Sequence, residues 1–172
     1  MKRLNVEIKA KCIDPQRVRV VLQEQNPRFI GEDHQIDTYF KVPNGRLKLR
    51  EGNIENALIH YQRSNQAGPK KSEVLLYKSQ LESSLKSLLV HALGILAVVD
   101  KRREIYFIDN VKFHIDRVEN LGTFLEIEAI SDNDAKTEQE LYEQCRFYIN
   151  LLGIQEQDLL TNSYSDMIIS EL

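Results

Sequence analysis

Two glutamates separated by one residue, Glu126 and Glu128, are the first candidates for chemistry in this sequence. They alternate with Leu125 and Ile127, which predicts a strand with one charged and one apolar face. On such a strand the two carboxylates lie on the same side, with their Cα atoms roughly 6–7 Å apart. Oxygen ligands of this kind suit hard divalent cations such as Mg²⁺. Taken alone, the pair is more often a solvated sheet face, so other residues must support a metal site.

Further acidic residues occur on other predicted strands. Asp116 shares a face with His114 in the strand before Glu126, and Glu7 lies in the first strand of the chain. If these strands are neighbours, the candidate metal ligands are Glu7, Asp116, Glu126 and Glu128. The four histidines include no pair at the spacing of zinc ligands, so the sequence does not predict a zinc site.

Basic residues also recur at two-residue spacing in several predicted strands. The set consists of Lys9, Lys48, Arg50, Arg63, Lys101 and Arg103. Arginine forks and lysine ammonium groups are the usual protein ligands of phosphate. Surface salt bridges explain any one of these residues equally well, because such pairs are common and each contributes little. They explain the repeated spacing less well, and the pattern favours a site for several linked phosphates.

The elements that must position these residues are mostly strands. In the first strand Val6, Ile8 and Ala10 alternate with polar or charged residues. Strands are expected at residues 4–12, 35–42, 46–51, 57–64, 73–79, 96–108, 111–118 and 123–130. Most of them are joined as antiparallel hairpins. Strands with one charged and one apolar face fit a barrel whose charged faces line the interior.

Helices are predicted between and after the strands. Asp14 and Pro15 are typical of a helix start. Apolar spacing predicts a second helix over residues 80–93, with Gly94 as its left-handed C-terminal cap. A capping box begins at Thr137. The fold class is therefore α+β: one domain over residues 1–172, with barrel strands at about 4–130, C-terminal helices at about 137–172, and the helices packed outside the barrel.

Composition limits the classes of function. The chain of 172 residues has 23 basic and 26 acidic residues and a net charge of −3, which argues against nucleic acid or an anionic membrane as a partner. No apolar run is long enough for a signal core or a membrane span, so a cytoplasmic location is expected. Cys12 and Cys145 are expected to be reduced and buried. The oligomeric state stays open, and a homodimer through a strand edge or helix face is one arrangement.

The ordered motifs resemble a known family. Residues 5–9 (NVEIK) are similar to the E-x-E-x-K strand that opens CYTH domains, the triphosphate tunnel metalloenzymes. The later matches, in chain order, are residues 37–40 (DTYF), 47–50 (LKLR), 99–103 (VDKRR) and 116–128, which follow the pattern D-x-V-x-x-L-G-x-F-x-E-x-E. Within the family, residues 35–40 and 45–51 look most like the class IV adenylyl cyclase branch.

The resemblance implies a fold and a set of roles. It implies an eight-stranded antiparallel barrel in which the basic set binds a triphosphate and the acidic set holds Mg²⁺ or Mn²⁺. It assigns catalytic roles to Glu7, Lys9, Lys101 and Arg103. The implied activity is conversion of ATP to cyclic AMP and pyrophosphate.

Two alternatives remain open at this point. The same tunnel in a triphosphatase would hydrolyse thiamine triphosphate or tripolyphosphate, and a non-catalytic module would only bind a triphosphate. The third reading is motivated by Asn5, which stands where the family motif has its first glutamate. Asparagine offers a metal a neutral oxygen but no charge, so this departure bears on the catalytic rate more than on triphosphate binding.

Overall fold

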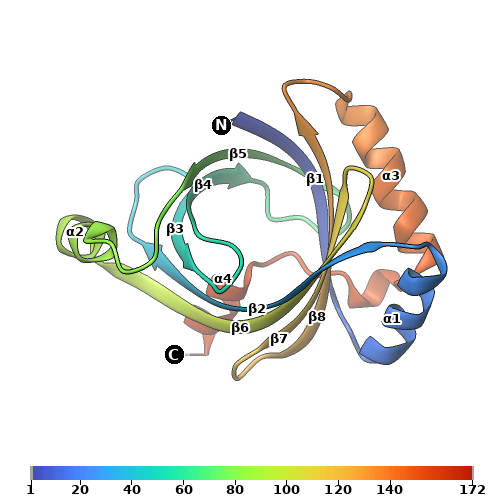
Figure 1. The fold of residues 1–172 in the computed structure, drawn as a ribbon, viewed down its shortest axis with the longest axis horizontal. Helices are drawn as coiled ribbons and strands as arrows, with labels where there is room; N and C mark the ends of the chain where they lie inside the picture. The colour runs from blue at the N-terminus through green and yellow to red at the C-terminus, as the bar shows by residue number, and fades with distance from the viewer. Residues whose placement is uncertain (1, 172) are drawn as a thin grey trace.

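The computed structural model describes residues 2–171 and shows eight strands that close into a barrel (Figure 1). The strands are β1 (Lys2–Lys11), β2 (Arg28–Phe40), β3 (Arg46–Glu51), β4 (Ala57–Arg63), β5 (Lys70–Lys78), β6 (Ile95–Ile108), β7 (Val111–Val118) and β8 (Gly122–Asp132). Their order around the barrel is β1-β5-β4-β3-β2-β6-β7-β8, and all neighbours are antiparallel. The predicted fold class is confirmed.

The helices are α1 (Pro15–Glu24), α2 (Leu85–Leu93), α3 (Glu138–Leu151) and α4 (Tyr164–Ser170), with a short 3₁₀ helix, η1 (Glu156–Asp158). Asp14 caps α1 by accepting a hydrogen bond from the backbone N–H of Arg17. Thr137 and Glu140 form both bonds of the predicted capping box at α3. These short polar side chains satisfy N–H groups that would otherwise lack partners in the first helical turn.

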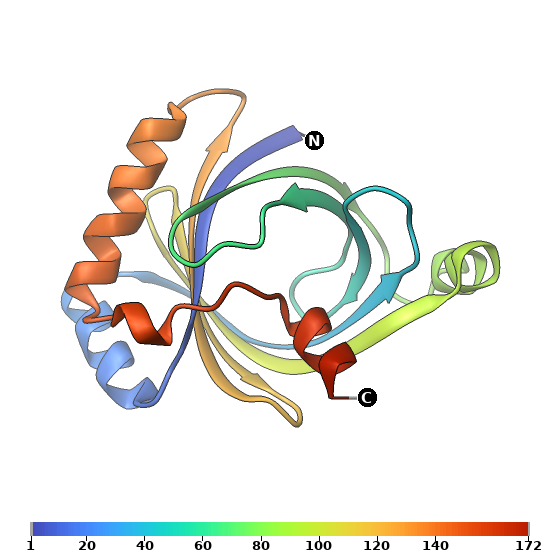
Figure 2. The same cartoon turned by 180° about the vertical axis from the view of Figure 1, so that it is seen from behind.

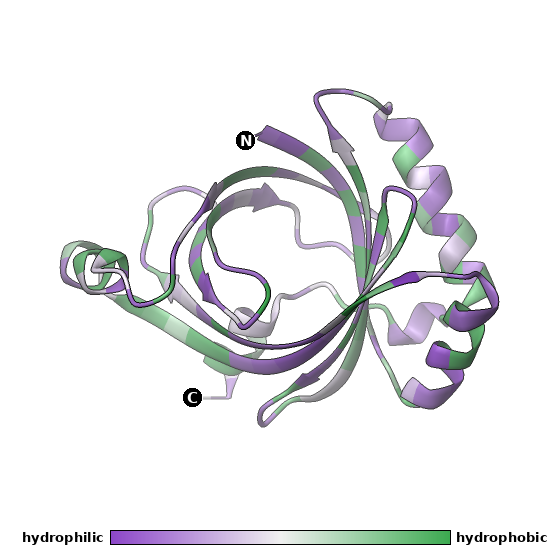
Figure 3. Cartoon of the chain, in the orientation of Figure 1, coloured by the Kyte–Doolittle hydropathy of each residue, from purple (hydrophilic) through white to green (hydrophobic). Residues whose placement is uncertain are grey.

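Alternation along the strands separates the two faces of the barrel wall, as the alternating colours in Figure 3 show. The apolar residues Val6 and Ile8 of β1 point outward and are buried with Leu22 of α1 and Leu141 of α3. This main core lies outside the barrel, between the wall and the two helices. Because period two is strict, the polar residues between them must face the barrel interior.

Several element boundaries differ from the sequence-based expectations; β5, for example, begins at Lys70 and not at residue 73. Strand β2 begins at Arg28 because it pairs with β6 along its whole length. Helix α2 begins at Leu85, since Glu82 has a φ of 59° and turns the chain before the helix. Gly94 has a φ of 76° but a ψ of 154°, so it is not the left-handed helical cap that was predicted.

The C-terminal segment passes across one end of the barrel, as Figure 2 shows from behind. The backbone N–H of Leu160 donates to the carbonyl of Lys9 at 2.9 Å, which ties this segment to β1. Tyr164, the first residue of α4, is buried with apolar residues of the barrel interior such as Tyr39 and Phe124. Helix α4 therefore helps to close that end.

Two simpler expectations concern the cysteines and membrane spans. Cys12 and Cys145 are free and buried, as expected. Within residues 2–171, none of the helices combines the length and the apolar character that crossing a bilayer requires.

Candidate functional site in the barrel interior

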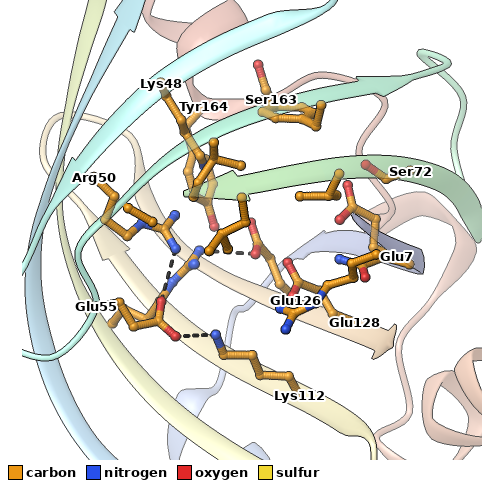
Figure 4. A pocket seen from close by; sticks show the side chains of 18 of the residues that line it. Glu7, Lys48, Arg50, Glu55, Ser72, Lys112, Glu126, Glu128, Ser163 and Tyr164 are labelled. Atoms are coloured by element: carbon orange, nitrogen blue, oxygen red, sulfur yellow. Dashed lines mark hydrogen bonds and ion pairs between the residues drawn. The ribbon is translucent and has the colours of Figure 1, made fainter. Parts of the chain in front are cut away.

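A cavity of about 620 Å³ lies inside the barrel and is lined by charged side chains (Figure 4). Every strand contributes lining residues, and the loop at 54–56 and the start of α4 add others. Because the inward faces of adjacent strands lie side by side in a closed barrel, residues from distant parts of the sequence meet here. The next question is which residues of the predicted basic and acidic sets line this cavity.

All six predicted basic residues line this cavity. They are Lys9, Lys48, Arg50, Arg63, Lys101 and Arg103. They come from β1, β3, β4 and β6, and the convergence expected from two-residue spacing is therefore present. Lys101 and Arg103 are both only 2% exposed, which makes a role as ordinary surface charges untenable. Their binding of phosphate stays a prediction.

The predicted acidic set divides into two groups. Glu7, Glu126 and Glu128 line the cavity. Asp116 is fully buried and accepts two hydrogen bonds from Arg103, at 2.7 and 2.6 Å, and one from the hydroxyl of Tyr164 at 2.7 Å. Asp116 thus holds Arg103 in place in this structure, and its role as a metal ligand stays a prediction.

Most of the charges in the cavity are already paired with one another. Lys9 bonds Glu126, and Arg63 bonds Glu7. Each of these pairs joins a residue from the predicted phosphate set to one from the predicted metal set. A ligand that binds one residue of such a pair therefore leaves the other residue without its partner, unless a second ligand binds that residue.

Asp37 neutralises the basic residues on the opposite wall. Arg50 donates to both its oxygens at 2.9 Å, and the ammonium groups of Lys101 and Lys48 lie 2.7 and 3.1 Å from it. Burial acts to raise the pKa of Asp37, but these three cations hold it well below its usual range. For Lys101, burial outweighs the attraction of Asp37 and lowers the pKa to about 7.

Glu126 and Glu128 differ in their surroundings. Burial acts to raise the pKa of Glu126, but Lys9 and Arg103 hold it well below its ordinary value. Burial and the nearby carboxylate of Glu7 raise the pKa of Glu128. Glu7 and Glu128 are direct cross-strand partners, and among residues 2–171 Glu128 makes no ion pair. Two close carboxylates with one of them unpaired favour a bound cation.

The donor atoms present fit a divalent metal ion. Ligand atoms of His114, Glu126 and Glu128 all lie within 4.8 Å of one another. The side-chain oxygen of Asn5 lines the same cavity and is buried without a hydrogen-bond partner. Burial, followed by the charge of Arg103, lowers the pKa of His114 to about 3, so its ring is neutral at pH 7, and Nδ1 lies 3.0 Å from Glu126. Carboxylate and amide oxygens are the ligands that Mg²⁺ and Mn²⁺ prefer.

Several site residues were not selected from the sequence. They are Asp37, Glu55, Lys112, Tyr39, Tyr61 and Tyr164. Asp37 and Lys112 continue the same period-two alternation as their neighbours, so the signal for them was present. Glu55 lies in a loop and Tyr164 begins a short helix, and no periodicity predicts where either points.

The CYTH domain is the family whose sequence profile matches this chain, over residues 3–164. The chain belongs to the CYTH family. A Methanocaldococcus jannaschii protein provisionally named an adenylate cyclase is 26% identical over 95% of this chain and 98% of its own length. A conserved hypothetical protein from Pyrococcus furiosus shares the fold with a TM-score of 0.78 and 26% identity, covering 94% of this chain and 98% of that protein.

A more distant structural neighbour shares the fold alone. It comes from Hippeastrum, with a TM-score of 0.60 and 12% identity over 98% of this chain and 95% of that one. That protein bears a provisional adenylyl cyclase name and is described as having a dominant triphosphatase activity. The recognition of the family from ordered motifs is confirmed.

Proposed function

We propose that this CYTH protein binds a triphosphate together with a divalent cation and cleaves it, with ATP converted to cyclic AMP and pyrophosphate as the main reaction. The observation that carries the proposal is the composition of the cavity. All six basic residues and three of the four acidic residues predicted from the sequence share one space of about 620 Å³. Linked phosphates and a metal ion are the ligands that complement both sets at once.

The basic residues would bind and orient the phosphates. Arg63 and Lys9 face Glu7 and Glu126, while Lys101 and Lys48 lie against Asp37 on the other wall. These cations are held by ion pairs and packing, so they need little reorganisation when negative charge develops on the leaving pyrophosphate. Holding the 3′ oxygen in line with the α-phosphorus further lowers the barrier. No side chain needs to form a covalent bond.

The acidic residues would hold Mg²⁺ or Mn²⁺. Glu7, Glu126 and Glu128 supply carboxylate oxygens, and Asn5 supplies a neutral one. When bound, the metal supplies positive charge against the phosphate oxygens. Arg103 and Lys9 keep the Glu126 carboxylate ionised, so it is ready to accept a metal at neutral pH.

The apolar part of the lining supports an organic triphosphate. Ile59, Val74 and Leu76 line the cavity together with the rings of Tyr39 and Tyr61. A bare polyphosphate gains nothing from such a surface, whereas a base and sugar bury apolar area against it. This feature favours ATP or another organic triphosphate over inorganic tripolyphosphate.

A triphosphatase activity is the second candidate. The described activity of the Hippeastrum neighbour shows that one fold and a cyclase-like name do not exclude hydrolysis. The same basic residues would then orient thiamine triphosphate or tripolyphosphate, with water as the nucleophile. The third reading, binding without turnover, is motivated by Asn5 in place of a charged metal ligand.

The products distinguish these activities. Pure protein is incubated with Mg²⁺ or Mn²⁺ and, separately, with ATP, thiamine triphosphate and tripolyphosphate, and the products are separated by chromatography. Cyclic AMP with pyrophosphate supports the main proposal, and orthophosphate with a shortened chain supports the triphosphatase. Intact substrates in every reaction would refute both activities and leave the binding module, which calorimetry would then test.

A further inference from the structure

One carboxylate in the cavity belongs to neither the metal side nor the strands. Glu55 lies in the loop between β3 and β4 and lines the cavity. Its side chain bonds Lys112, and it accepts a hydrogen bond from Nη1 of Arg50 at 3.1 Å. Figure 4 shows these ion pairs on one side of the cavity, away from Glu7 and Glu128. The carboxylate bridges two cations as a phosphoryl group would.

The loop that carries Glu55 is held in place by hydrogen bonds to its backbone. The buried carboxylate of Asp33 accepts the backbone N–H groups of Ile54 and Glu55, both at 2.9 Å. The Asn56 side chain bonds the backbone of Gly52 twice, at 3.0 and 2.9 Å. A Cβ atom on Gly52 would lie 2.7 Å from Asp33, so the close packing there requires glycine. The backbone that carries Glu55 is therefore held in place, and the side chain itself is held by its ion pairs with Lys112 and Arg50.

Its charge is permanent at neutral pH. Burial acts to raise the pKa of Glu55, but Lys112 and Arg50 hold it below its ordinary value. Within residues 2–171, Lys112 makes its one ion pair with Glu55, and two nitrogens of Arg50 are already used by Asp37. A phosphoryl group can reach this pair of cations only by displacing a fixed negative charge.

We propose that Glu55 sets the length of the phosphate chain that the cavity accepts, because its carboxylate occupies, between Arg50 and Lys112, the position that a fourth phosphoryl group would take. The inference rests on the proposed triphosphate binding and adds a limit to it. Lys112 is the cross-strand partner of Glu128, so this position borders the space assigned to metal and phosphates. A longer chain meets repulsion from Glu55, while a triphosphate ends before it.

The test compares tripolyphosphate with tetrapolyphosphate. Apparent dissociation constants are measured from thermal unfolding midpoints with excess Mg²⁺, and ligand in millimolar excess prevents depletion by turnover. The wild-type protein should bind tripolyphosphate more tightly. Glu55→Gln keeps the size of the side chain and the backbone bonds to Asp33, and it should shift the ratio of the two constants toward tetrapolyphosphate by roughly tenfold.

Two further variants show where the effect arises. Lys112→Gln added to Glu55→Gln removes one of the two freed cations, so it should reverse most of the shift. Glu32→Gln is the matched control, because it also removes one negative charge that is paired with a cation. Glu32 is exposed on the outer wall, and its Oε1 lies 3.7 Å from Nη1 of Arg102. This variant should leave the ratio unchanged.

The outcomes separate the two proposals. Wild-type binding of tripolyphosphate with a ratio that Glu55→Gln does not change would overturn the inference alone. Equal wild-type binding of both chains would overturn it as well. No binding of either chain by any variant would overturn the inference, and no binding of ATP in the same assay would refute triphosphate binding itself.

Discussion

At the scale of single residues, the three carboxylates proposed to hold a metal are not equivalent. Glu126 is engaged by Lys9, Arg103 and His114, whereas Glu128 makes no ion pair among the described residues. Removing Glu126 would leave the buried ammonium of Lys9 without its ion-pair partner and would take one of two carboxylate partners from Arg103. A loss of activity could then reflect a loss of folding stability. Glu128 is therefore the better residue with which to test the metal site.

Glu128→Gln should lower metal-dependent turnover by about a hundredfold or more, because a carboxylate ligand becomes a neutral amide. The unfolding midpoint should stay the same or rise slightly, since the substitution relieves repulsion between Glu128 and Glu7. Turnover is measured across a metal titration, and unfolding is measured by heating. Full turnover at ordinary metal concentrations would remove Glu128 from the metal site.

Lys101 should make triphosphate binding depend on pH. Its pKa of about 7 means that the ammonium is largely deprotonated at about pH 8, and phosphate oxygens favour the protonated form. Binding at about pH 8 should therefore take up a proton. Calorimetry in buffers with different ionisation enthalpies measures this uptake. Lys101→Arg should abolish it, and the same uptake in both proteins would exclude Lys101 as its source.

The lowered pKa of Lys101 should also make the free energy of unfolding depend on pH. The pKa of Lys101 is about 7 when folded and 10.5 when unfolded, so the unfolded chain binds more protons between these values. The free energy of unfolding should therefore rise as the pH increases from about 7, relative to that of Lys101→Met. Urea unfolding at several pH values measures the difference, and parallel curves for the two proteins would contradict it.

At the scale of elements, regular strands were predictable and the segments between them were not. Period-two alternation located β3 and β7 to the residue and placed Lys48, Arg50 and Asp116 on inward faces. The cap residues Asp14 and Thr137 located α1 and α3, because their chemistry is local. Which cations pair with which acids depends on strand order, and no local pattern contains that information.

Helix α4 contributes to the site through its first residue, Tyr164. The Tyr164 hydroxyl donates to Asp116, and the Lys9 ammonium lies 3.5 Å from the centre of the Tyr164 ring. Tyr164→Phe should lower the free energy of unfolding by about 1–3 kcal/mol, because a bond to a buried charge is lost while the ring remains. Urea unfolding measures this loss. Tyr77→Phe, at a residue that is 66% exposed, is the control and should have no effect.

At the scale of the whole molecule, the cavity of the free protein is neutralised internally. Arg63 with Glu7 and Lys9 with Glu126 each join a cation of the predicted phosphate set to an acid of the predicted metal set. Either ligand alone breaks these pairs and leaves buried charges without partners, whereas both together give every member a new partner. The two ligands should therefore stabilise each other's binding.

Thermal unfolding tests this coupling. The rise in midpoint with Mg²⁺ and tripolyphosphate together should exceed the sum of the rises with each alone, because ligands stabilise in proportion to the logarithm of their effective affinity. The measurement uses the wild-type protein with each ligand varied separately and jointly. Additive shifts would show that the ion pairs do not link the two sites.

The strand order also bears on how the protein is made. Strand β1 is translated first, yet its partners are β5 and β8. Lys9 of β1 pairs with Glu126 of β8, which is 117 residues later in the chain. Contacts of such separation form slowly, because the intervening chain must be ordered first. The first strand therefore has no partner until β5 has been made, and the charged interior is complete only when β8 closes the ring.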